Sequence, residues 1–112
     1  MTGYDRELLK GSTEGLVLSV ISNGPTYGYE LIRELEARSN GYFHFREGTL
    51  YPALHRMEKE GLIEGKWQTL PGGQERRYYY ITPTGAAVLS RRRSIWSEFS
   101  AAVRSVLDAK TA

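Results

Sequence analysis

Hydrophobic positions recur along the chain with two spacings, and the changes between them predict the order of its elements. Up to Gly61 the apolar residues fall three or four positions apart, as in amphipathic helices. From Leu62 to Ile81 the period is that of strands, whose successive side chains point to opposite faces. After Thr82 the helical spacing returns and runs to about Asp108. We therefore expect three helices, a β-hairpin and one long final helix.

The first two helices are expected over residues 6–22 and from Thr26 to residue 38. Side chains at 12–14 offer an internal start to the first helix, and the Thr26 hydroxyl is expected to cap the second. The Asn-Gly-Pro run at 23–25 and the Ser-Asn-Gly run at 39–41 end them. Their apolar stripes are Leu9, Leu16, Val17, Val20 and Ile21 in the first helix and Leu31, Ile32 and Leu35 in the second.

The third helix, within residues 46–61, has one apolar face and one mixed face. Leu50, Leu54 and Met57 recur at i, i+4 and i+7 and so share a side of the helix, which Gly61 ends at the C′ position. A short helix whose other side offers a hydroxyl, rings and cations suits the DNA major groove. We interpret it as a recognition helix, and an ordinary surface helix with solvated charges is the alternative. The mixed face carries Thr49, Pro52, Arg56 and Lys59, with Tyr51 and His55 beside it.

The strand-like segment is expected to form a hairpin of residues 62–69 and 76–81. The Gly-Gly pair in the turn at 70–74 readily supplies the positive φ angles that a hairpin needs. Ile63 and Trp67 fall on one side of the first strand, and Tyr79 and Ile81 share one face of the second. A hairpin directly after a recognition helix is the wing of a winged helix. The side chains expected near its tip, within reach of phosphates, are Lys66, Gln68, Arg76 and Arg77.

The final helix carries an apolar stripe that the preceding closed unit does not need. Thr82 is its expected N-cap and Pro83 its first residue, and it spans about 39 Å at 1.5 Å per residue. We expect the same helix of a second subunit to cover this stripe in a two-fold dimer. The alternative is that the helix folds back on its own domain. The stripe consists of Ile95, Trp96, Phe99, Ala102, Val103, Val106 and Leu107.

The expected fold class is therefore mainly α with a small β-hairpin (α+β). We expect a winged helix-turn-helix DNA-binding domain over residues 1–82 and a C-terminal dimerisation helix over residues 83–112. The side chains expected to hold the dimer together are Trp96, Phe99, Val103, Val106 and Leu107.

Composition and charge narrow the class of protein. The chain has no cysteine, no apolar run near the 18 or so residues of a membrane span and no signal-peptide pattern, so we expect a soluble, cytoplasmic protein. The net charge of +2 is unevenly distributed. Residues 1–45 carry 4 Lys/Arg against 6 Asp/Glu, whereas residues 46–93 carry 9 against 5. A basic segment of this kind is the footprint of a polyanion binder.

An enzyme and a protein-interaction module are the rival classes. His44 and His55 have no acidic residues in a metal-binding pattern around them, and the Gly24–Gly28 segment lacks the Lys-Ser/Thr pair of a phosphate loop. We therefore expect no catalytic residue, no metal and no cofactor. A winged helix that binds protein instead of DNA remains open, and the basic middle segment argues against it.

Five stretches resemble the PadR family of transcriptional regulators, in the family's order and over roughly residues 7–107. They are LKGSTEGLVL at 9–18, GPTYGYE at 24–30, GTLYPAL at 48–54, EGLI at 60–63, and RYY with ITPTG at 77–85. The single short C-terminal helix is similar to that of the smaller subfamily. One departure is Tyr80, where many members have a charged or polar residue.

The resemblance implies a repressor that dimerises through its C-terminal helix and binds a palindromic operator. It implies that Thr49, Tyr51 and Pro52 enter the major groove, with Tyr27 and Tyr29 close to the DNA backbone. Several members release DNA on binding a small aromatic molecule. Trp96 is similar in position to a tryptophan that lines a pore at the dimer centre in drug-sensing members.

These expectations give each candidate residue a role. Base preference would come from Thr49, Tyr51, His55 and Arg56, and an arginine paired with guanine is worth about 1–3 kcal/mol. His55 as a solvated helix residue is the alternative. A planar aromatic ligand would stack on Trp96 between walls of Ile95, Phe99 and Val103, and plain interface packing is the alternative for Trp96. The candidates for phosphate neutralisation are Arg46, Arg56, Lys59, Lys66, Arg76 and Arg77.

Overall fold

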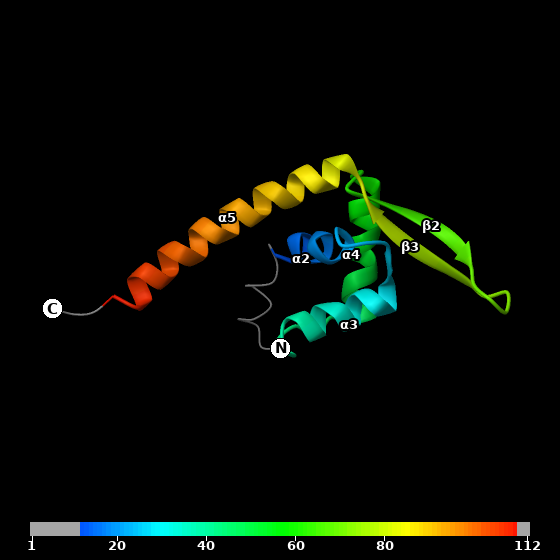
Figure 1. Cartoon of the computed structure of the whole chain (residues 1–112), viewed down its shortest axis with the longest axis horizontal. Coiled ribbons are helices and arrows are strands. Elements are labelled where there is room, and N and C mark those ends of the chain that lie inside the picture. Colours follow the sequence, from blue (N-terminus) through cyan, green and yellow to red (C-terminus); the bar gives the residue numbers. More distant parts are fainter. Residues whose placement is uncertain (1–11, 110–112) are drawn as a thin grey trace.

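The structure is a computed structural model that describes residues 12–109, which form four helices and a small three-stranded antiparallel sheet. In Figure 1, α2, α3 and α4 group together, the β2–β3 hairpin projects to one side and α5 extends to the other. The molecule is consequently elongated, measuring 66 × 29 × 21 Å. The elements are α2 (Thr13–Ile21), β1 (Thr26–Tyr27), α3 (Gly28–Arg38), α4 (Glu47–Lys59), β2 (Ile63–Thr69), β3 (Glu75–Ile81) and α5 (Pro83–Leu107).

The predicted apolar stripes form the core. Val17, Val20 and Ile21 of α2 pack with Leu31 and Leu35 of α3, and all five side chains are buried. The α4 stripe of Leu50, Leu54 and Met57 is fully buried against them, as its spacing predicts. Leu9 and the predicted helical segment at 6–11 lie outside the described residues. The sheet and the last helix complete the core with Ile63, Tyr79 and Leu89.

Thr26 is not the helix cap that the sequence predicts. It lies with Tyr27 in β1, which pairs antiparallel with Tyr79 and Tyr78 of β3 and gives the strand order β1-β3-β2. Its side chain is buried, and its hydroxyl donates to the Gly24 carbonyl oxygen at 3.0 Å. The sheet therefore has three strands instead of the predicted two, because β1 pairs with the outer edge of β3, whose backbone groups would otherwise be unpaired.

The end of α4 and the start of α5 lie side by side and are hydrogen-bonded to each other. Gly61 has φ 78° and follows the helix at C′, with Gly61 N–H donating to the Glu58 carbonyl at 3.1 Å and Leu62 N–H to the Met57 carbonyl at 2.9 Å. Thr82 caps α5 as predicted, since its Oγ1 accepts from Gly85 N–H at 3.0 Å. The same hydroxyl donates to the Gly61 carbonyl at 2.6 Å. These bonds fix the position of the hairpin relative to both helices.

The first half of α5 packs on α2, and the second half extends beyond it. Leu89 is buried, and Arg92 donates to Glu14 Oε1 of α2 from Nε at 3.0 Å and from Nη2 at 2.5 Å. Further along, the apolar stripe is exposed: Trp96 is 58% and Leu107 76% accessible. The described part of the chain thus leaves the second half of α5 uncovered (Figure 1).

Candidate nucleic-acid interface

The exposed side of α4 carries the predicted recognition residues together. We call Thr49, Pro52, Arg56 and Lys59 the recognition face, and all four are exposed. They lie opposite the buried stripe of this helix, as the sequence spacing requires. His55 is also exposed beside them, and Arg46 is the exposed N-cap residue of α4.

Tyr51 lies across the start of α3 and is 43% exposed. A Cβ built on Gly28 would come within 2.5 Å of the Tyr51 hydroxyl oxygen, so the ring occupies the space that the missing side chain leaves. Gly28 therefore has a packing role that sequence reasoning missed. The only sequence indication is that a glycine starts a helix between two tyrosines.

The two tyrosines on either side of Gly28 have different surroundings. Tyr27 packs edge-to-face against Tyr78, with 5.4 Å between the ring centroids. The Arg76 guanidinium lies over the Tyr27 ring, 3.9 Å from its centroid. Tyr29 is 54% exposed, with Arg33 on the next turn of α3 lying 5.8 Å from its ring. Tyr29 is thus the more accessible of this predicted pair.

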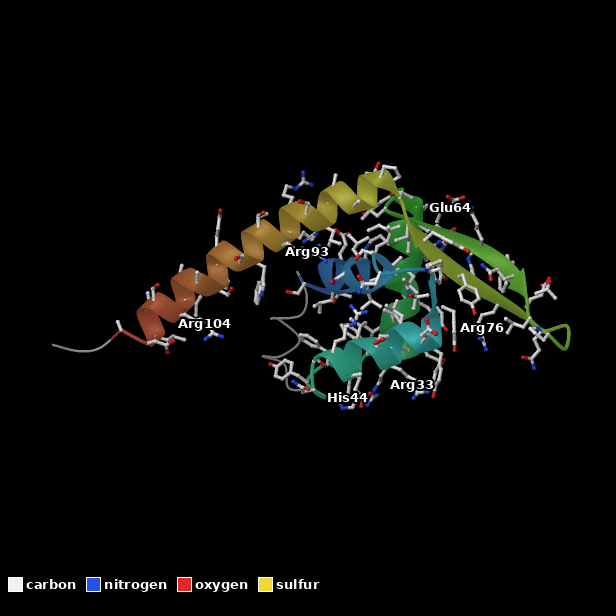
Figure 2. The ribbon with its side chains drawn as sticks, in the orientation of Figure 1. Arg33, His44, Glu64, Arg76, Arg93 and Arg104 are labelled. Carbon is white, nitrogen blue, oxygen red and sulfur yellow. The ribbon has the colours of Figure 1, made fainter. Side chains whose placement is uncertain are left out.

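The wing, which we define as residues 63–81, separates its predicted contact residues onto two faces. Arg76 projects toward the start of α3 (Figure 2) and shares its face with Lys66 and Gln68. On that face Lys66 lies over the Tyr80 ring at 5.2 Å, and Gln68 Nε2 donates to the Tyr80 hydroxyl at 2.6 Å. Arg77 is on the other face, toward α4. The predicted quartet is therefore not gathered into one cluster at the tip.

Arg77 is bound to α4 by an ion pair with Glu58. Its Nη2 donates to Glu58 Oε2 at 2.5 Å, and both side chains are 29% exposed. The same carboxylate oxygen accepts from Gly65 N–H at 3.3 Å. The sequence prediction treats Arg77 as a phosphate ligand and Glu58 as a solvated residue. In the structure the two residues join the wing to α4.

Two ionisable groups of the wing have shifted pKa values. Burial raises the pKa of the Tyr79 phenol, and the nearby Arg77 guanidinium opposes this shift. Hydrogen bonding with the Tyr78 side chain raises the pKa of Arg76. Arg76 thus lies on the face of the wing that carries Lys66, and Tyr79 lies on the face toward α4 with Arg77.

Two concavities lie beside the wing, one against α4 and one against the start of α3. Their volumes are about 590 and 690 Å³, and Tyr51, Trp67, Arg77 and Tyr79 line both. A third hollow, between α2 and α5, has about 260 Å³ and is bordered by Ile95 and Trp96. The other two predicted ligand residues, Phe99 and Val103, lie farther along the exposed stripe of α5.

Other kinds of site are not evident in the described part of the chain. Within residues 12–109, none of the helices combines the length and apolar character needed to cross a bilayer. Over the same residues, no three His, Cys, Asp or Glu side chains are placed to hold a metal ion. The arrangement that stands out is an exposed helix face flanked by a hairpin. This arrangement defines a winged helix-turn-helix protein.

Comparison with known proteins gives the family. The model of the PadR-like transcriptional regulator family matches residues 17–91. The chain is 34% identical over 95 residues to Transcriptional regulator Rv3488 of Mycobacterium tuberculosis, covering 85% of each chain. A crystal structure of a PadR-like transcriptional regulator (BC4206) from Bacillus cereus matches with a TM-score of 0.82 and 38% identity, over 93% of this chain and 99% of that one. The chain belongs to the PadR-like family of DNA-binding transcriptional regulators.

A further structure shares the fold at lower identity. Bacillus subtilis PadR, solved in complex with operator DNA, is 19% identical with a TM-score of 0.65, over 70% of this chain and 45% of that one. The family assignment agrees with the resemblance stated from the sequence, and the winged-helix fold predicted there is confirmed.

Proposed function

We propose that this regulator acts as a homodimeric repressor whose α4 enters the major groove of a palindromic operator. The observation that carries the proposal is the exposed recognition face of α4 with the wing beside it. A helix of this width fits the major groove, and the adjacent hairpin then lies near the phosphate backbone. Operator binding by Bacillus subtilis PadR, which has the same fold, supports the proposal.

Each cation of the interface has a separable contribution. Arg56 and Lys59 lie on the recognition face and Arg46 at the start of the helix. A phosphate contact releases bound counterions, so losing one makes the log–log salt dependence less steep by about 0.9. Base contacts, by contrast, change the preference among DNA sequences.

Binding to the DNA upstream of the protein's own gene tests this function. Gel shifts at two salt concentrations should show a specific complex, and Lys59→Ala should weaken it and flatten the salt dependence. Arg104→Ala is the matched control, since it removes a cation from the far end of α5 (Figure 2). A complex that forms equally with any duplex would contradict sequence-specific binding, and no complex at all would favour a role in protein interaction instead.

The dimer is supported by the uncovered stripe on the second half of α5. Ile95, Trp96 and Phe99 are each more than half exposed, and so are Val106 and Leu107 farther along. A run of large apolar side chains on one side of a helix marks an interaction surface. A second copy related by a two-fold axis would cover it with the same residues, and the same axis would produce a palindromic operator.

The proposed regulation places a planar aromatic ligand between the Trp96 side chains of the two subunits. Trp96 already packs against Phe99, with 5.8 Å between ring centroids. A ligand that fits only one angle between the subunits shifts the population toward that angle and so moves the two α4 helices.

Tryptophan fluorescence titrated with a panel of planar aromatics tests the ligand site. Quenching is expected in the wild type and should disappear in Trp96→Ala, which controls for the contribution of Trp67. Unchanged fluorescence across the panel would leave interface packing as the role of Trp96. Repression itself predicts more transcript from the regulated promoter when the gene is deleted.

A further inference from the structure

Trp67 is an exposed indole on the inner face of the wing. It shares this face of the sheet with Ile63 and Tyr79, which are buried, yet Trp67 is 63% exposed. The core ends before it, because β2 projects beyond α4 toward the tip of the hairpin (Figure 1). Trp67 lines a concavity together with the rings of Tyr51 and Tyr79, and aromatic side chains grouped in this way are typical of interfaces.

The side chain of Trp67 is supported by Arg77. The Arg77 guanidinium lies 5.5 Å from the Trp67 ring and 5.9 Å from the Tyr79 ring, so it sits between them. Gly65 makes this path possible, because a Cβ at that position would come within 2.5 Å of Arg77 Nε. The ion pair with Glu58 holds the other end of the guanidinium. Arg77 therefore supports the indole and is itself anchored to α4 through Glu58.

The charge balance of this surface indicates what Trp67 contacts. The charge of Arg77 is offset by Glu58, so the floor of the concavity offers rings and little net charge. Lys59 and His55 stand on its α4 side. A surface with uncharged rings beside a cation is complementary to a nucleic-acid backbone, in which uncharged sugars alternate with charged phosphates. Docking of α4 in the major groove, as proposed above, would bring the strand that borders the groove to the concavity between α4 and the wing.

We propose that Trp67 contacts this DNA strand directly, with its indole packed against a deoxyribose of the operator backbone. Arg77 is then a positioning residue, which holds Trp67 and does not neutralise a phosphate. The inference rests on the proposed operator binding and adds a residue to it that neither charge nor motif indicates.

Operator affinity measured as a function of salt tests the contact. Trp67→Ala should weaken binding about tenfold, which is typical for the loss of one packed aromatic contact. The salt slope should stay unchanged, because no charge is removed, whereas Lys59→Ala should flatten it by about 0.9. Trp67→Phe should restore most of the affinity. Tyr42→Ala, which removes a ring of similar exposure (58%) outside the wing and the recognition face, is the matched control and should bind as the wild type does.

Two further readouts separate a contact from a structural effect. Operator DNA should change the tryptophan fluorescence of the wild type, and Trp67→Phe, which still binds, should lose that change. Arg77→Met should weaken binding in the wild type and have no further effect in Trp67→Ala, since both act through one contact. Arg77→Met with a flattened salt slope would instead make Arg77 a phosphate ligand and would overturn its positioning role.

The outcomes distinguish this inference from the function on which it rests. A wild-type protein that binds no operator contradicts the proposed function. A wild-type protein that binds, together with a folded Trp67→Ala variant of equal affinity, overturns only the role of Trp67. Thermal unfolding of each variant establishes that it is folded, and little change is expected for so exposed a side chain.

Discussion

Gly85 determines how closely the first turn of α5 approaches the end of α4. A Cβ at this position would lie 2.0 Å from the Leu62 carbonyl oxygen, which is backbone and cannot move away alone. Gly85→Ala should therefore destabilise the protein by about 1–3 kcal/mol, measured by urea unfolding. Gly48→Ala is the matched control, because nothing lies within 4 Å of its Cβ position and alanine favours a helix. A Gly85→Ala variant with unchanged stability would show that the first turn of α5 does not pack this closely against Leu62.

Because of Tyr79, the stability of the protein should decrease with pH in the alkaline range. Burial raises the pKa of its phenol above the ordinary 10.0, so the folded state favours the neutral form. The stabilisation is fully present below pH 10.0 and is lost as the pH rises through the folded value. As the pH rises from neutral to above 10.0, the urea midpoint should fall less for Tyr79→Phe than for the wild type. Tyr42→Phe, on an exposed side chain, is the control, and equal losses in both variants would contradict the assignment.

The wing and α4 behave as one unit because Glu58 and Arg77 join them. Both side chains are only 29% exposed, so their charge-assisted bond should contribute about 1–2 kcal/mol to stability. A double-mutant cycle of Glu58→Gln and Arg77→Met measures this coupling. The exposed pair Glu34–Arg38, at 3.7 Å on one face of α3, is the control and should couple by less than about 0.5 kcal/mol. Equal coupling in the two cycles would mean that the wing is held in some other way.

The elements that sequence reasoning recovers are those specified by local pattern. The Leu50–Met57 stripe, the Gly61 stop and the Thr82 cap each depend on neighbours a few residues away, and each is observed. Strand β1 was missed because two residues show no periodicity and pair with β3, which is more than fifty positions away. The Glu58–Arg77 pair was missed for a related reason, because charge alone does not reveal a partner 19 residues away.

In the candidate site, too, local spacing could be predicted from the sequence, whereas contacts between elements could not. The recognition face follows from helical spacing, and all of its members are exposed together. The two faces of the wing follow from alternation, but which cation is already paired depends on the packing of the hairpin against α4. Gly28 and Gly65 have roles only in three dimensions, since each makes room for a side chain from another element.

At the scale of the whole molecule, α5 should join two copies of the chain. Its exposed stripe includes Phe99, which is 57% accessible in the single chain. Light scattering should find a dimer for the wild type and a monomer for Phe99→Glu, because a buried unpaired carboxylate is costly. Ser97→Glu puts the same charge on the other side of the helix and should stay dimeric. A wild type that is monomeric at working concentration would remove the basis for a two-fold operator.

Footprinting of the wild-type dimer on its upstream DNA tests the central claim most directly. Two α4 helices related by the two-fold axis should protect an inverted repeat whose half-sites are about 34 Å apart, one turn of B-DNA. Thr49→Ala and Arg56→Ala should weaken protection of both halves together. Protection of one half-site without symmetry, or of no defined sequence, would contradict the account.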